Sequence, residues 1–209
     1  MNAMQKTLLY IFLSFSIIFI CLLPLEPYAS NFAIKAIPAI SLAALAFIAV
    51  TGLRGKLLFT SLLFCAAADI ALELRMEMSF IIGLGLFLFA HILFIATFSR
   101  DLKAQKSKLS IIILLAVYAI MMGFVLTPQL QEMAIPVYIY LMAITLMGIF
   151  AALRASENDF TLYGAIAFIV SDSILAINKF MMPVPAADYL IMITYYLSLF
   201  LIVYGFLKK

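Results

Sequence analysis

Eight long apolar runs, separated by charged residues and prolines, dominate this sequence of 209 residues. A hydrocarbon core takes about 20 apolar residues per helix, with a range of about 17 to 25. Lipid offers the backbone no hydrogen-bond partners, so only helices or closed barrels span it, and continuous runs favour helices over alternating strands. We predict an all-α polytopic membrane protein, a bundle of eight transmembrane helices in a single domain covering residues 1–209. The runs are Leu8–Leu23, Phe32–Val50, Leu57–Leu74, Ser79–Phe98, Leu109–Thr127, Ala134–Leu153, Phe160–Phe180 and Ala187–Phe206.

The amino-acid composition excludes a soluble globular protein. Hydrophobic residues make up 67% of the chain and charged residues only 11%, a balance that a soluble surface of this length does not tolerate. The net charge of +3 is scattered between the apolar runs, which indicates membrane orientation rather than nucleic-acid binding. Cys21 and Cys65 both fall inside apolar runs and suggest neither a disulfide framework nor a paired metal-ligand motif.

The distribution of lysine and arginine predicts the orientation. If both termini are cytoplasmic, ten of the thirteen basic residues lie on the cytoplasmic side, as the positive-inside rule requires. We therefore predict an integral protein of a bacterial inner membrane with both termini inside. The cytoplasmic basic residues are Lys6, Arg54, Lys56, Arg100, Lys103, Lys106, Lys108, Arg154, Lys208 and Lys209, and the three exceptions are Lys35, Arg75 and Lys179.

The first apolar run also fits a signal peptide, because Lys6 precedes it. The segment Pro27-Tyr28-Ala29 is a poor small-residue cleavage site, however. A retained first helix is the favoured interpretation.

Two short similarities suggest an internal repeat. Ile37-Pro38-Ala39 in the second run resembles Ile135-Pro136-Val137 in the sixth, and Ala68-Asp69-Ile70 in the third resembles Ser171-Asp172-Ser173 in the seventh. A parallel repeat of two four-helix halves would place Asp69 and Asp172 at the same depth. Short apolar segments of similar sequence also recur by chance in a chain of such composition.

Two carboxylates inside apolar runs are the main candidates for chemistry. A charged side chain at the bilayer centre costs about 2.5 to 3.5 kcal/mol on insertion scales, so Asp69 and Asp172 are paired, protonated or functional. Counting helical rise, both lie in the outer half of the membrane, with Glu73 one turn beyond Asp69. The structural alternative is an ion-pair network between the third and seventh helices, through Lys35 or Lys179.

Other polar residues have weaker signals. His91 in the fourth run fits an acid or base and equally an interhelical hydrogen bond. A single histidine excludes a three-histidine zinc site. Tyr195 and Tyr196, together with Tyr138 and Tyr140, could present hydroxyls to a lipid headgroup, although interfacial aromatic belts are commoner.

One long stretch resembles a known family. Residues 164–180, which read GAIAFIVSDSILAINKF, strongly resemble the signature of the YhhN family of lysoplasmalogenase-like membrane proteins. The similarity runs from about Lys35 onward, and at Ala68 the chain departs from the glycine that is common in the family. The other stretches that agree are Lys35-Ala36-Ile37-Pro38, Ala68-Asp69, Gly83-Leu84 and Ala90-His91.

The resemblance implies hydrolysis of the vinyl-ether bond of lysoplasmalogens to a fatty aldehyde and glycerophosphoethanolamine or glycerophosphocholine, with no metal or organic cofactor. Such hydrolysis needs one protonated carboxylic acid and one ionised carboxylate, and two nearby carboxylates resist ionising together. On this hypothesis Asp69 and Asp172 are the catalytic pair, in unassigned order. The substrate, a lysophospholipid, would meet supporting or binding residues at Lys35, Glu73, His91, Asn178, Lys179 and Tyr195.

A different function class remains open. Two four-helix halves with carboxylates inside the membrane also fit a proton-coupled transporter of lipids or small molecules. Transporter helices are often broken by glycine or proline at matching positions, whereas Pro38 and Pro136 are predicted at helix starts, where proline is tolerated. An intramembrane aspartyl protease would also use two aspartates, but neither carries the neighbouring residues of that class. Headgroup preference and oligomeric state are not predicted.

Overall fold

The computed structural model describes residues 1–28, 30–103 and 108–207 of the chain. It is all-helical over these residues apart from one isolated bridge between Leu102 and Arg154, which confirms the predicted all-α class. Ala29, Lys106, Lys208 and Lys209, which the predicted cleavage segment and charge distribution included, lie outside the described residues. The helices are α1 (Ala3–Leu22), η1 (Leu23–Leu25), α2 (Asn31–Ala49), α3 (Gly52–Glu73), α4 (Ser79–Phe98), η2 (Ser99–Asp101), α5 (Leu109–Leu130), η4 (Gln131–Met133), α6 (Ala134–Leu153), α7 (Phe160–Phe180) and α8 (Ala187–Leu207).

Seven helical stretches in the described ranges are long and apolar enough to cross a membrane, which supports an integral membrane protein. The predicted number of eight spans differs from this number by one. The difference arises at Leu109–Leu153, a single stretch of 45 residues that contains both α5 and α6. The short helix η4 joins these two helices directly, with Gln131 at a φ of +46°, so no unwound segment separates them.

Two prolines occupy positions that the sequence did not predict. Pro38 lies well inside α2 rather than at its start, and Pro128 lies inside α5 rather than beyond its end. Proline removes one backbone hydrogen bond from a helix, a loss that neighbouring groups offset in membrane helices. In α2 the carbonyl that loses its donor is that of Ile34, whereas the Ser41 hydroxyl donates to the carbonyl oxygen of Pro38 itself at 2.8 Å. Pro136 does lie in the first turn of α6.

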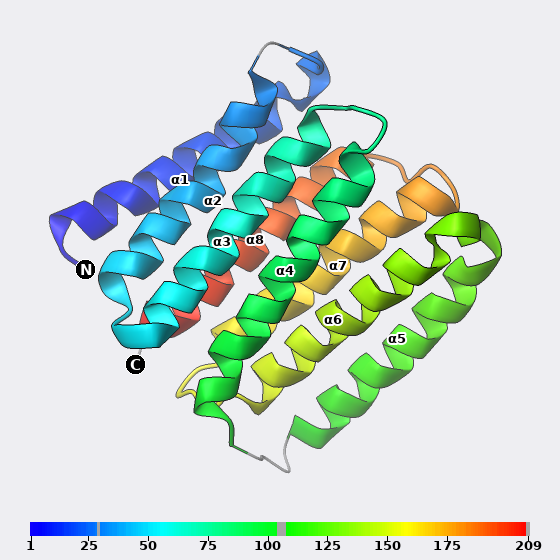
Figure 1. Ribbon diagram of the computed structural model, residues 1–209. Helices are drawn as coiled ribbons and strands as arrows, with labels where there is room; N and C mark the ends of the chain where they lie inside the picture. Colours follow the sequence, from blue (N-terminus) through cyan, green and yellow to red (C-terminus); the bar gives the residue numbers. More distant parts are fainter. Residues whose placement is uncertain (29, 104–107, 208–209) are drawn as a thin grey trace. The chain divides into compact units, whose positions relative to one another are not determined.

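The chain forms two compact units, with the boundary between Thr97 and Phe98. In the first unit α2 packs most closely against α3, and α1 covers α2, so these three helices lie side by side in chain order (Figure 1). In the second unit the closest pair is α7 and α8, while α6 contacts both α5 and α7. The two units therefore pack their helices differently, and the predicted parallel repeat is not confirmed. The single domain stays a prediction.

Two glycines allow the close approach of α7 and α8. A Cβ atom on Gly164 would lie 2.7 Å from the backbone nitrogen of Ile202 and 2.8 Å from the carbonyl oxygen of Ser198. A Cβ atom on Gly205 would lie 2.7 Å from the backbone nitrogen of Thr161. Small residues are the usual means of bringing membrane helices together, since lipid supplies no hydrophobic force between them.

Arg154, which served only to predict orientation from the sequence, has a packing role. Its guanidinium lies 3.7 Å from the ring centre of Phe206 and donates to the Thr161 hydroxyl at 2.7 Å and to the Gly205 carbonyl at 3.2 Å. It also approaches Asp101 at 3.7 Å. One side chain after the end of α6 thus ties together α7, α8 and the segment after α4.

We expect Gly164→Ala to destabilise the second unit by about 1–3 kcal/mol, because the added methyl group meets backbone atoms of α8 that cannot rotate away. Gly85→Ala is the matched control, since a Cβ atom there meets nothing within 4 Å. Thermal unfolding of the purified variants in detergent measures both effects. Equal midpoints for the two variants would contradict the packing described here.

Candidate functional site

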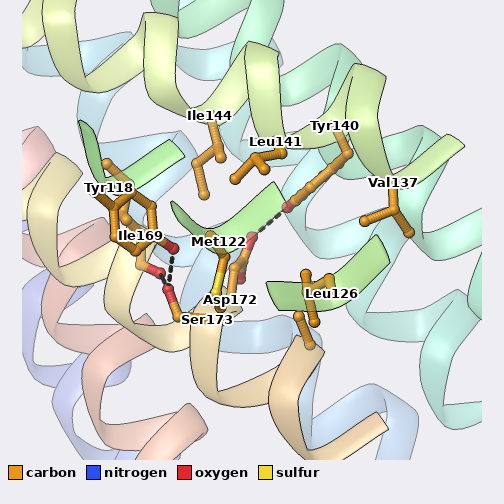
Figure 2. A pocket seen from close by; sticks show the side chains of 11 residues that line it. Tyr118, Met122, Leu126, Val137, Tyr140, Leu141, Ile144, Ile169, Asp172 and Ser173 are labelled. Carbon is orange, nitrogen blue, oxygen red and sulfur yellow. Dashed lines mark hydrogen bonds between the residues drawn. The ribbon is translucent and has the colours of Figure 1, made fainter. Parts of the chain in front are cut away.

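A small cavity between α5, α6 and α7 contains Asp172, one of the two carboxylates predicted from the sequence, which is half-buried (Figure 2). The Tyr140 hydroxyl, on α6, donates a hydrogen bond to Asp172 Oδ2 on α7. The cavity has a volume of about 40 Å³. A site of that size holds water but is too small for an alkyl chain. Its lining residues are Tyr118, Met122, Leu126, Val137, Tyr140, Leu141, Ile144, Ile169, Asp172, Ser173 and Ala176.

A second hydroxyl pair faces the same cavity. Tyr118 on α5 is hydrogen-bonded to Ser173 on α7, and the Ser173 hydroxyl donates to the Ile169 carbonyl one turn earlier. The three consecutive polar residues Ser171, Asp172 and Ser173 do not share one environment, because Ser171 points elsewhere and donates to the Ile191 carbonyl of α8 at 3.0 Å. Asp172 and Ser173 supply the cavity, whereas Ser171 holds α7 to α8.

A larger and more open groove lies on α5 and α6. It has a volume of about 530 Å³, and Leu141 lines both this groove and the cavity beside Asp172. Its walls are mainly apolar, but Thr127 and Tyr138 form a hydroxyl pair there at 2.7 Å. Its size and apolar walls suit an extended hydrocarbon chain.

In the first unit, an ion pair joins the beginning of α2 to the end of α3. Lys35 Nζ lies 2.7 Å from Glu73 Oε1, and the Asn31 amide donates to Glu73 Oε2 at 2.8 Å. Both charged side chains are almost completely buried, at 11% and 8% exposure. The Lys35 ammonium also lies 5.7 Å from the ring centre of Phe19 on α1. The structure thus brings together two of the predicted binding residues.

The charged cluster continues into the adjoining loops. Arg75 pairs with Glu26 at 2.6 Å and lies 4.0 Å from Glu73, with half of its side chain exposed. Partial burial, reinforced by the negative charges of Glu26 and Glu73, raises the pKa of Tyr28 above its usual value. Tyr28 therefore stays neutral at physiological pH and adds no further charge to this cluster.

The remaining predicted site residues occupy different environments. Asp69 on α3 and His91 on α4 are buried within the first unit. Tyr195 is buried on α8, where its ring meets Phe168 edge-on at 5.5 Å, so its ring has a packing role. Near the end of α7, the Asn178 side chain accepts a hydrogen bond from the Val184 backbone at 2.9 Å, whereas Lys179 is exposed.

Asp69 belongs to the first unit and Asp172 to the second. Their predicted meeting in one chamber stays a prediction, as do the catalytic and binding roles assigned from the sequence.

Sequence reasoning missed several residues of these sites. The sequence does not single out Tyr118, and it presents Tyr140 only as a headgroup contact or, more commonly, an interfacial aromatic. Tyr118 lies near the middle of the run Leu109–Thr127, too deep for a headgroup belt, and this depth could have identified it. Asn31 carried no such signal, because it precedes the apolar run and its contact with Glu73 depends on how α2 and α3 pack.

Comparison with known proteins places the chain in a family. The YhhN family matches residues 30–206. The chain belongs to the YhhN family. It is 30% identical over 156 residues to a protein named Lysoplasmalogenase from Mycobacterium bovis, a match that covers 72% of the chain and 60% of that relative. It is also 30% identical over 154 residues to Lysoplasmalogenase TMEM86A from Homo sapiens, covering 69% of the chain and 62% of that protein.

This YhhN chain thus spans about three fifths of the length of these curated relatives. No solved structure matches it.

We expect Glu73→Gln to destabilise the protein by about 3–5 kcal/mol, because it removes a buried carboxylate that is ion-paired with the buried Lys35 ammonium. Glu77→Gln, which removes an exposed carboxylate just beyond α3, is the control and should change stability by less than about 0.5 kcal/mol. Denaturant unfolding in detergent gives both values. If Lys35 instead binds a substrate phosphate with no help from Glu73, the Glu73 variant will be as stable as its control.

Proposed function

We propose that this protein is a lysoplasmalogenase, a membrane hydrolase that cleaves the vinyl-ether bond of a lysoplasmalogen. Membership of the YhhN family and similarity to proteins named lysoplasmalogenase support an ether-lipid hydrolase. The observation that carries the proposal is Asp172, a carboxylate held by a tyrosine hydroxyl at a water-sized cavity within otherwise apolar helices. Intramembrane carboxylates usually mark a site or a pathway.

The chemistry requires an acid and a base. A carboxylic acid protonates the alkenyl carbon farther from the ether oxygen, which gives an oxocarbenium ion. Water then bonds to the positively charged carbon as a carboxylate takes its proton, and the hemiacetal collapses. The products are a fatty aldehyde and glycerophosphoethanolamine or glycerophosphocholine. We assign the two carboxyl groups to Asp69 and Asp172, because a low-dielectric site favours one protonated and one ionised member of such a pair.

The substrate would lie with its headgroup at the outer side of the membrane. There Lys35 and Lys179 would attract the phosphate, with Glu73, His91, Asn178 and Tyr195 in support, as the sequence predicted. The single alkyl chain would occupy the apolar groove on α5 and α6, next to the wall that Leu141 shares with the Asp172 cavity. We place the protein in a bacterial inner membrane with both termini cytoplasmic, as its basic residues indicate.

The direct test is release of aldehyde from a lysoplasmalogen by the purified protein. We expect Asp172→Asn and Asp69→Asn each to lower the rate by a factor of roughly 100 or more, the usual contribution of a general acid or base. Asp188→Asn is the matched control, since Asp188 is an exposed aspartate in the first turn of α8. Full activity in both of the first two variants would reject the assignment, and a native protein without aldehyde release would reject the activity itself.

Metal removal gives an independent test. The proposed steps use only carboxyl groups and water, so exhaustive dialysis against a chelator should leave the rate of aldehyde release unchanged. The rate is measured before dialysis, after dialysis and after adding back divalent cations. Loss of activity that zinc or magnesium restores would show that the carboxyl groups do not act alone.

A further inference from the structure

We propose, on the basis of the lysoplasmalogenase activity argued above, that the cavity beside Asp172 holds the water molecule consumed in hydrolysis. In this arrangement Asp172 is the base that takes the proton from water, Tyr118 supplies a second acceptor, and Tyr140 is the positioning residue for Asp172.

The cavity is large enough for water and too small for the substrate's alkyl chain. A cavity needs roughly 10–15 Å³ of space to hold one water molecule, and this one has a volume of about 40 Å³. Its side-chain lining is apolar except for Tyr118, Tyr140, Asp172 and Ser173. A buried water needs about two to four polar partners, which these four side chains supply.

Each hydroxyl hydrogen around the cavity is already donated in a hydrogen bond within the protein. Ser173 has one hydroxyl hydrogen and donates it to the Ile169 carbonyl, so Tyr118 must be the donor in its bond to Ser173. Tyr140 donates its own hydrogen to Asp172 Oδ2. The three hydroxyl groups therefore offer only lone pairs to a molecule inside the cavity, as does an ionised carboxylate.

A water molecule among acceptors can only donate. Its two hydrogens would point at Asp172 and at the Tyr118 oxygen, and its two lone pairs would accept no hydrogen bond. One of these lone pairs is the nucleophile, which bonds to the oxocarbenium carbon while Asp172 takes one proton. Asp172 then passes this proton to the departing glycerol oxygen, and the hemiacetal hydroxyl proton returns to the acid, so both carboxyl groups regain their starting states.

Methanol as a competing nucleophile tests the water site. It adds to the same oxocarbenium carbon and gives a stable mixed acetal, whereas water gives aldehyde. We expect the native protein to yield almost only aldehyde, and Tyr118→Phe and Ser173→Ala to raise the acetal share by up to roughly tenfold, the effect of one lost hydrogen bond. This ratio does not depend on the fraction of protein that is folded.

The role of Tyr140 has a tyrosine control elsewhere in the second unit. Tyr163 on α7 is exposed and lines neither the Asp172 cavity nor the groove on α5 and α6. Tyr140→Phe should lower kcat by roughly tenfold or more with an unchanged KM, as expected for a lost bond to a charged group, whereas Tyr163→Phe should leave kcat unchanged.

These experiments distinguish failure of the proposed water site from failure of the proposed lysoplasmalogenase activity. Equal acetal shares in the native protein, Tyr118→Phe and Ser173→Ala would overturn the water site while aldehyde release still supports the activity. Equal kcat values in Tyr163→Phe and Tyr140→Phe would overturn the positioning role. A native protein that releases no aldehyde would remove the proposed activity, and the water site with it.

Discussion

The absence of hydrogen-bond partners in hydrocarbon is the constraint on which the rest of this structure depends. Backbone groups satisfy one another within helices, and hydroxyl side chains do the same locally. Ser61, Thr97 and Thr145 each donate to the carbonyl four residues earlier in their own helix. Polar side chains that cannot be satisfied in this way must find partners on other helices, and these few partnerships define the places where chemistry can occur.

Two such partnerships have different characters. Lys35 and Glu73 form an ion pair where α2 begins and α3 ends, and Asn31 and Arg75 also contact Glu73. Asp172 instead accepts one hydrogen bond from a neutral tyrosine and lies on the wall of a cavity. A matched ion pair neutralises itself, whereas a carboxylate with a neutral partner keeps its capacity to take or give a proton. This contrast is why the proposed chemistry is placed at Asp172 and a binding or structural role at Glu73.

Several features of the site could not have been predicted from residue order alone. The apolar runs indicated helices and their depth, and a carboxylate inside a run indicated a special role for Asp172. Which hydroxyl reaches it depends on helix rotation and on the pairing of α6 with α7, since Tyr138 and Tyr140 lie on one helix yet have different partners. Likewise, Pro38 and Pro128 suggested boundaries, but continuous helices carry both, because one lost backbone bond costs less than unwinding a helix in lipid.

The sequence by itself determined the solvent of this protein, its all-helical class, the positions of its apolar segments to within a few residues, and its family. These properties follow from composition, run length and local motif, which do not depend on how helices pack. Tertiary structure alone decided that Ser171 donates a hydrogen bond to α8 while Ser173 is hydrogen-bonded to Tyr118. It also decided that Lys35 forms an ion pair with Glu73. Side-chain partners across helices depend on rotation and approach, which close packing at residues such as Gly164 sets and which no single run of sequence encodes.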